Sequence, residues 1–171
     1  IFSKMPRNIE IKARLTREEQ YEIISRLDDP KYLEQVDTFF NVPNGRLKLR
    51  EVKGAEAELI FYDRPNSSGP KVSDYDKSPV SDPTSMKAVL SSANGVKGIL
   101  KKVRQLNFVG QTRVHFDTVE GLGKFVEFEV VLQDHQSVEE GQKIATELMK
   151  RFKIEPDDLI SCAYVDMLYS E

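Results

Sequence analysis

The chain has 171 residues and a mass of 19.6 kDa, which is enough for one domain with a sizeable core. Its net charge of −3 and pI near 5.6 exclude a globally basic protein that attracts nucleic acid or an anionic membrane, so any basic site must be local. The single Cys162 excludes an internal disulfide, and because we find neither a membrane-spanning stretch nor a leader peptide, we expect a cytoplasmic protein.

The first predicted element is a β-strand over residues 8–15, near the start of a single domain that we expect to span 5–171. Met5 has the position of a natural first residue, so residues 1–4 are interpreted as a remnant outside the fold. Side chains of a strand alternate between its two faces. The apolar face here carries Ile9, Ile11, Ala13 and Leu15, and the polar face carries Asn8, Glu10, Lys12 and Arg14.

The rest of the chain alternates between predicted strands and helices. Further strands are predicted at 34–40, 46–52, 57–64, 96–108, 111–119 and 124–132. Helices are predicted at about 17–27, 84–92 and 137–152, where capping boxes at Thr16 and Ser137 begin the first and third and Asp82-Pro83 begins the second. A short helix follows Glu155, residues 163–168 form a helix or a strand, and residues 66–79 are expected to form a loop, as a lid or an edge strand.

Charged side chains recur on the non-aliphatic faces of these strands. They are Glu10, Lys12, Arg14, Lys48, Arg50, Lys102, Arg104, Arg113, Asp117, Glu127 and Glu129. If the sheet closes and helices cover its aliphatic outer face, the charged faces point inward. The predicted fold is therefore α+β, an eight-stranded antiparallel closed β-barrel with helices packed outside. The alternative is an open sheet whose charged face pairs with itself in water.

A charged barrel interior favours a polyanion and a divalent metal as its contents. An eight-stranded barrel has room for side chains or one small ligand, and unpaired buried ions are costly. Lysine and arginine would neutralise the polyanion, while carboxylates would hold a hard cation such as Mg²⁺, which usually binds one or two carboxylates together with phosphates. The candidate carboxylates are Glu10, Glu127 and Glu129, with Asp117 as a fourth.

Several stretches follow, in order, the pattern of one known family. Glu10-Ile11-Lys12 resembles the second half of an ExExK motif, and the pattern continues through Asp37–Phe40, Arg46–Arg50, Ala57–Ile60, Gly110–Arg113, Glu120–Glu129 and Ala163–Asp166. The chain thereby resembles the CYTH proteins, or triphosphate tunnel metalloenzymes, which include class IV adenylate cyclases, thiamine triphosphatases and inorganic triphosphatases. Within the family it looks most like the cyclase branch, through Phe39-Phe40-Asn41, Tyr62–Pro65, Ser73–Tyr75 and Tyr164–Asp166.

The resemblance implies a triphosphate tunnel that binds its substrate with Mg²⁺ or Mn²⁺. The implied metal ligands are Glu10, Glu127 and Glu129, with Asp117 as a helper. The implied phosphate-binding residues are Lys12, Lys48, Arg50, Lys102, Arg104 and Arg113, with Arg14 and Arg64 as further candidates. Catalysis is assigned to Glu10, Lys12, Arg50 and Arg113.

The resemblance also implies an activity and a partner. The expected reaction converts ATP to cyclic AMP and pyrophosphate, and the alternative is hydrolysis of the terminal phosphate of tripolyphosphate or thiamine triphosphate. The expected partner is such a small-molecule triphosphate, with neither nucleic acid nor a membrane, and a homodimer is one option for assembly.

One residue departs from the family pattern. The first Glu of ExExK is replaced by Asn8, which offers a carbonyl oxygen without a charge and so removes one anionic ligand. This change puts a second metal, or high turnover, in doubt. It also keeps open a third function, that of a polyphosphate- or nucleotide-binding module without catalysis.

Four further residues have both a functional and a structural interpretation. His115 is either a proton-transfer group or, as we favour, a hydrogen-bonded barrel histidine. Tyr62 and Tyr164 either stack on a base or close the barrel. Cys162 is expected to be a buried small hydrophobe, since no neighbouring cation would activate its thiol.

Overall fold

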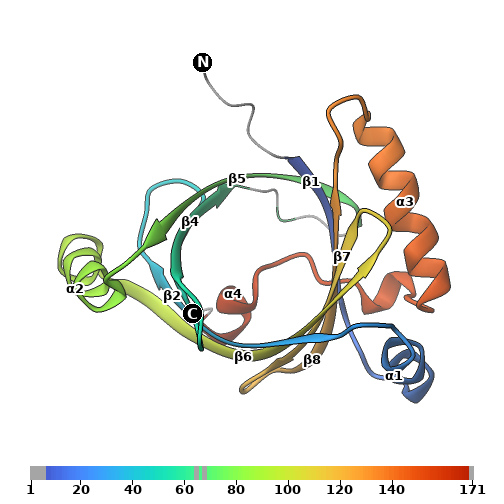
Figure 1. The fold of residues 1–171 in the computed structure, drawn as a ribbon, viewed down its shortest axis with the longest axis horizontal. Coiled ribbons are helices and arrows are strands. Elements are labelled where there is room, and N and C mark those ends of the chain that lie inside the picture. The colour runs from blue at the N-terminus through green and yellow to red at the C-terminus, as the bar shows by residue number, and fades with distance from the viewer. Residues whose placement is uncertain (1–6, 64–65, 67–68, 170–171) are drawn as a thin grey trace.

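Eight strands close into a barrel (Figure 1) in this computed structural model, which describes residues 7–63, 66 and 69–169. The strands are β1 (Arg7–Arg14), β2 (Lys31–Phe40), β3 (Arg46–Val52), β4 (Ala57–Asp63), β5 (Lys71–Val80), β6 (Val96–Val109), β7 (Thr112–Val119) and β8 (Gly123–Val131). Their order around the barrel is β1-β5-β4-β3-β2-β6-β7-β8, with every neighbouring pair antiparallel. The predicted closed antiparallel barrel is confirmed. The interpretation of residues 1–4 lies outside the described residues.

Strand β5 corrects the prediction for residues 66–79. The sequence predicts a lid or an edge strand there, but β5 pairs on both sides, with β1 (Ile9 opposite Val72) and with β4 (Tyr62 opposite Tyr75). The strand was hidden because its composition is mostly polar, so it lacks the alternation of aliphatic and polar residues that marks a half-buried strand. Pairing with two neighbours, rather than its own hydrophobic pattern, holds β5 in the barrel.

Three helices pack on the outside of the barrel, as predicted. Helix α1 (Glu18–Ser25) and helix α3 (Val138–Arg151) contribute to the core that covers β1 and β8, while α2 (Pro83–Asn94) covers the outer face of β2 and β3. In Figure 1, α3 lies along one side of the ring and α2 along the opposite side. Gly141 lets α3 approach β1 closely, because a Cβ at this position would clash with Ile9 and Leu132. Within the part of the chain that the structure describes, we find no helix that could span a lipid bilayer.

The helix starts follow the predicted capping chemistry in two of three cases. Ser137 and Glu140 form the expected box, and Asp82 accepts a hydrogen bond from the amide of Ser85. At α1 the prediction is wrong by one residue. Gln20, rather than Glu19, accepts from the amides of residues 16 and 17, and Glu19 instead pairs with Lys153 at 2.7 Å.

The C-terminal segment forms the floor of the barrel interior. It contains a 3₁₀ turn (Pro156–Asp158) and helix α4 (Tyr164–Tyr169), so residues 164–168 are helical rather than part of a strand. The segment is tied to the barrel by hydrogen bonds from the amide of Ile160 to the carbonyl of Lys12 and from Lys71 Nζ to the carbonyl of Ser161. A hydrophobic cluster of Phe39, Leu100, Val119, Phe125, Ala163, Tyr164 and Val165 seals this end.

Candidate functional site

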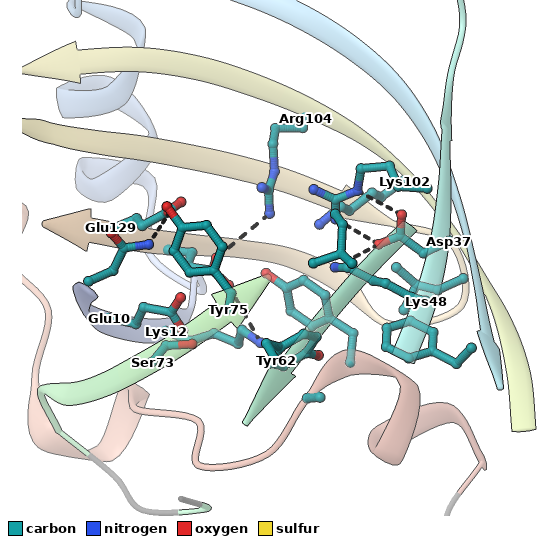
Figure 2. Close-up of a pocket in the computed structure, with 18 of the residues that line it drawn as sticks. Glu10, Lys12, Asp37, Lys48, Tyr62, Ser73, Tyr75, Lys102, Arg104 and Glu129 are labelled. Atoms are coloured by element: carbon teal, nitrogen blue, oxygen red, sulfur yellow. Dashed lines mark hydrogen bonds and ion pairs between the residues drawn. The ribbon is translucent and has the colours of Figure 1, made fainter. Parts of the chain in front are cut away.

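The inner face of the barrel surrounds a cavity of about 110 Å³. Figure 2 shows charged side chains converging on it from strands on several sides. Among the described residues that line it, six are cationic and four are carboxylates, namely Lys12, Lys48, Arg50, Lys77, Lys102 and Arg104 with Glu10, Asp37, Glu127 and Glu129. A chain with a net charge of −3 therefore encloses a local excess of positive charge.

On one side of the cavity, Asp37 organises two cations; we call Asp37, Lys48 and Arg50 the Asp37 group. The Asp37 carboxylate accepts from Arg50 Nε at 2.8 Å and Nη2 at 2.7 Å, and from Lys48 Nζ at 3.2 Å. Burial alone would raise the pKa of Asp37, but the charges of Arg50 and Lys48 hold it well below its usual value. Burial, followed by the charge of Arg50, lowers the pKa of Lys48 to about 8.

A second cluster, the Asp117 group (Asp117, Lys102 and Arg104), repeats this geometry on the adjoining strands β6 and β7. Asp117 accepts from Arg104 Nε and Nη2, both at 2.7 Å, and from Lys102 Nζ at 3.2 Å. The Tyr164 hydroxyl donates to the same carboxylate at 3.0 Å. Burial, with the charge of Arg104, lowers the pKa of Lys102 to about 7.

Both groups use one pattern, a Lys-x-Arg on one strand opposite an Asp on its neighbour. In each group one carboxylate is shared by two cations, and in the Asp117 group Arg104 Nη2 also lies 4.0 Å from Glu127 Oε1. Burying such charges is costly unless a ligand compensates them. The pKa of Lys102 is low because burial disfavours its charged form, and a bound polyanion would favour the charged form again.

Glu127 and Glu129 lie on β8 and face the cavity. Lys12 Nζ lies 3.5 Å from Glu127 Oε2, and Arg113 Nη2 donates to Glu129 Oε1 at 2.7 Å. Burial alone would raise the pKa of Glu127, but the positive charges of Lys12 and Arg104 hold it well below its usual value, so this carboxylate is ionised at neutral pH. Burial lowers the pKa of His115.

These residues fit a divalent cation. One ligand atom from each of His115, Glu127 and Glu129 lies within 4.8 Å of the others. Two buried polar atoms at this place, Asn8 Oδ1 and His115 Nδ1, make no hydrogen bond, although buried polar atoms normally have a partner. Glu10 lies opposite Glu129 in the β1–β8 pairing and lines the cavity as a further carboxylate.

The structure places the predicted phosphate-binding residues in different surroundings. Lys12, Lys48, Arg50, Lys102 and Arg104 line the cavity. Arg113, whose side chain is 29% exposed, is held by Glu129. Arg14 shares a face with Lys12 but lies toward the end of β1, where its Nη1 donates to the carbonyl of Leu122 at 2.9 Å and its guanidinium stacks on Phe125. Arg64 lies outside the described residues.

Asp117 was predicted as a helper in metal binding, and the structure surrounds it with cations instead. Its side chain is fully buried and hydrogen-bonded to Lys102, Arg104 and Tyr164. Among the described residues, the candidate metal cluster consists of His115, Glu127 and Glu129 and does not contain Asp117. Its contacts therefore suit the positioning of two phosphate-binding cations.

The structure also decides between most of the paired interpretations. Tyr164 closes the barrel, because its hydroxyl is bound to Asp117 and its ring packs on Phe125 with a centroid distance of 4.8 Å. Tyr62 lines the cavity. For His115 the structure shows that Nδ1 makes no hydrogen bond and lies 3.6 Å from Glu127 Oε1. Cys162 is only partly buried rather than a core residue.

Sequence reasoning missed several residues of the site. Asp37 carried a detectable signal, because the turn at Pro43-Asn44-Gly45 sets a register that places Asp37 opposite Arg50. Ser73 and Tyr75 of β5 also line the cavity, and Figure 2 shows Tyr75 projecting toward Glu129 and Arg104. No local signal marked these two residues, because β5 itself was not predicted as a barrel strand.

Comparisons with known proteins agree with this architecture. The family model described as "CYTH domain" matches residues 6–164. Among solved structures, a conserved hypothetical protein from Pyrococcus furiosus is 23% identical with a TM-score of 0.80, covering 93% of this chain and 98% of its own. The PH1012 protein from Pyrococcus horikoshii is 21% identical, with a TM-score of 0.79 and the same coverages.

A further solved structure carries a functional description. A Vibrio parahaemolyticus protein, provisionally described as an adenylate cyclase, is 18% identical with a TM-score of 0.77, covering 96% of this chain and 99% of its own. At these identities, the likeness to solved structures establishes the fold alone. No curated protein sequence matches the chain.

Proposed function

Because the chain belongs to the CYTH domain family, we propose that it is a metal-dependent enzyme acting on a small-molecule triphosphate held inside the barrel. The observation that carries this proposal is the presence of two matched cation groups and a carboxylate pair around one cavity inside the barrel. The first proposed reaction is the conversion of ATP to cyclic AMP and pyrophosphate. Tyr62 and Tyr75, which are opposite each other in the β4–β5 pairing and line the cavity, offer surfaces for a base.

The chain's own residues would bind and orient the phosphates. Phosphoryl chemistry asks the protein chiefly for positioning and for stabilisation of charge on oxygen atoms. In cyclisation the ribose 3′-hydroxyl attacks the α-phosphorus and pyrophosphate leaves, so the Asp37 and Asp117 groups would hold the oxygens of the leaving pyrophosphate. Glu127 and Glu129 would hold the cation, with Glu10 beside them. Neutralisation of charge on the phosphate oxygens is the chemistry that Mg²⁺ or Mn²⁺ supplies at such a site.

Hydrolysis of a terminal phosphate is the second candidate. A cavity of about 110 Å³ is small beside the roughly 300–1,000 Å³ of typical organic-ligand pockets, which favours a phosphate chain over a whole nucleotide inside the barrel. In this reaction water attacks the terminal phosphorus and the same cation groups hold the rest of the chain.

The test is to incubate the protein with Mg²⁺ or Mn²⁺ and either ATP or tripolyphosphate, and to measure cyclic AMP and orthophosphate. Cyclic AMP from ATP supports the first reaction, and orthophosphate from tripolyphosphate supports the second. If the protein shows no turnover but is stabilised by about 2.7 kcal/mol at a hundredfold excess of tripolyphosphate over Kd, it is a binding module rather than an enzyme. If the protein shows no turnover and no stabilisation, the result contradicts both the enzyme and the binding module.

Binding should be accompanied by proton uptake at Lys102. The pKa of this group is about 7 in the free protein, so at pH 8 most molecules carry it uncharged, and a polyanion beside it would restore the proton. Titration calorimetry of tripolyphosphate at pH 8, in buffers of different ionisation heat, should show roughly one more proton taken up by the wild type than by Lys102→Met. The variant is the control for protons exchanged by the ligand itself, and equal proton counts would exclude Lys102 from the phosphate site.

A further inference from the structure

His115 occupies an unusual position for a buried histidine. It lies on β7 opposite Glu127, faces the barrel interior and is only 5% exposed. Its Nδ1 lies 3.6 Å from Glu127 Oε1 and its Nε2 lies 3.9 Å from Glu129 Oε2, and Nδ1 makes no hydrogen bond. Each ring nitrogen thus faces a carboxylate at a distance longer than a hydrogen bond.

This arrangement leaves a place for a cation. A neutral imidazole has one N–H donor and one nitrogen lone pair. Whichever nitrogen carries the proton, the lone pair of the other faces a carboxylate oxygen, and two acceptors in this position repel each other. A metal ion bound to the imidazole nitrogen and to the carboxylate oxygen would replace this repulsion with two coordination bonds.

The neighbouring Asn8 makes a nitrogen ligand more important. It stands where a carboxylate would add negative charge, and its Nδ2 donates to Glu129 Oε1 while its own Oδ1 makes no hydrogen bond. The site therefore combines two carboxylates, an amide carbonyl and an imidazole. Mg²⁺ prefers oxygen ligands, whereas imidazole suits first-row transition metals.

We propose that His115 is a nitrogen ligand, with Glu127 and Glu129, of the divalent cation in this barrel, and that the site consequently selects Mn²⁺, Co²⁺ or Zn²⁺ over Mg²⁺. The inference rests on the proposed function in placing this cation beside the triphosphate. Metal binding itself can be measured without any substrate, so the two can fail separately.

The test uses pulsed electron paramagnetic resonance of Mn²⁺ added to the full chain without substrate. The chain has two histidines, and His135 is exposed in a turn, so His135→Gln leaves His115 as the single histidine and serves as the matched control. The Mn²⁺ echo should show ¹⁴N modulation in the wild type and in His135→Gln, and the modulation should disappear in His115→Gln. Modulation that persists in a folded His115→Gln protein would overturn the proposal.

A second measurement does not depend on the folding of His115→Gln. When His135→Gln is produced with ¹⁵N-labelled histidine, the modulation should change from ¹⁴N to ¹⁵N, and an unchanged ¹⁴N signal or none would overturn the proposal. Titration calorimetry adds the selectivity: His115→Gln should weaken Co²⁺ binding at least about tenfold, with a much smaller effect on Mg²⁺. Equal losses for both metals would contradict the role of the imidazole.

Turnover of a triphosphate distinguishes this inference from the proposed function. Turnover with Mg²⁺ in a protein without histidine modulation would overturn the inference and leave the proposed function standing. Histidine modulation in a protein that neither binds nor turns over any triphosphate would support the metal ligand and contradict the proposed function.

Discussion

Replacing Lys102 by methionine is expected to weaken tripolyphosphate binding by about ten- to a hundredfold, the usual value of a hydrogen bond to a charged group. Turnover should fall by about a hundredfold or more if Lys102 holds charge that develops on phosphate oxygens. The side chain is 3% exposed, and its ammonium faces the cavity beside Arg104. Methionine keeps much of the apolar length and removes the charge.

The same substitution should not destabilise the free protein at pH 6. Burial lowers the pKa of Lys102 from 10.5 to about 7, so between about pH 7 and 10 the unfolded chain holds more protons than the folded one. The stability of the wild type therefore rises with pH across this window, and its burial penalty is greatest below pH 7. Urea unfolding at pH 6 should show that Lys102→Met is at least as stable as the wild type. Between pH 6 and pH 9 the free energy of unfolding of the variant should lack the increase that deprotonation of Lys102 gives the wild type.

The matched control is Lys101→Met, one residue earlier on β6 and exposed on the outer face. It should leave the binding and turnover of the triphosphate unchanged. Equal affinity losses in the two variants would show a general charge effect rather than a contact inside the barrel. Full affinity in Lys102→Met would remove this residue from the site.

Replacing Asp117 by asparagine is expected to cause the largest loss of stability, about 3–5 kcal/mol, because it leaves buried cations without their counter-charge. Asp117 is fully buried and receives both nitrogens of the Arg104 fork together with Lys102. Asparagine has nearly the same shape, so packing changes little. The free energy of unfolding in urea measures the effect.

Tripolyphosphate should stabilise Asp117→Asn at least as much as it stabilises the wild type, because its phosphates supply the missing negative charge. The exposed Asp157→Asn is the control and should change the free energy of unfolding by less than about 0.5 kcal/mol. An Asp117→Asn protein as stable as the wild type would contradict the described ion pairs. Stabilisation by tripolyphosphate in the wild type alone would place the ligand elsewhere.

The barrel was predictable because its strongest signal is local. Alternation of aliphatic and charged residues in β1, β3 and β7 identifies both the strands and the face that each presents. Closure then decides which face is inside, since α1, α2 and α3 cover the aliphatic face. Strand β5 has little aliphatic alternation, and its place between β1 and β4 depends on tertiary pairing.

Contacts within the site were less predictable than its residues. Alternation places Arg14 and Lys12 on one face but does not say how far along the barrel each lies, and Arg14 reaches Leu122 instead of the cavity. The alternation likewise placed Asp117 inside the barrel but did not identify the residues that it contacts. The bond from Tyr164 joins residues 47 positions apart, which no local pattern encodes. The unbonded nitrogen of His115 needs coordinates to be seen.

The most direct test of a triphosphate site in the barrel is a crystal structure of the protein with Mn²⁺ and tripolyphosphate. The account predicts phosphate oxygens within hydrogen-bond distance of Lys102, Arg104 and Arg50, with Mn²⁺ bound to Glu127 and Glu129. A triphosphate bound on the outer surface, with these cations still contacting only Asp37 and Asp117, would contradict it.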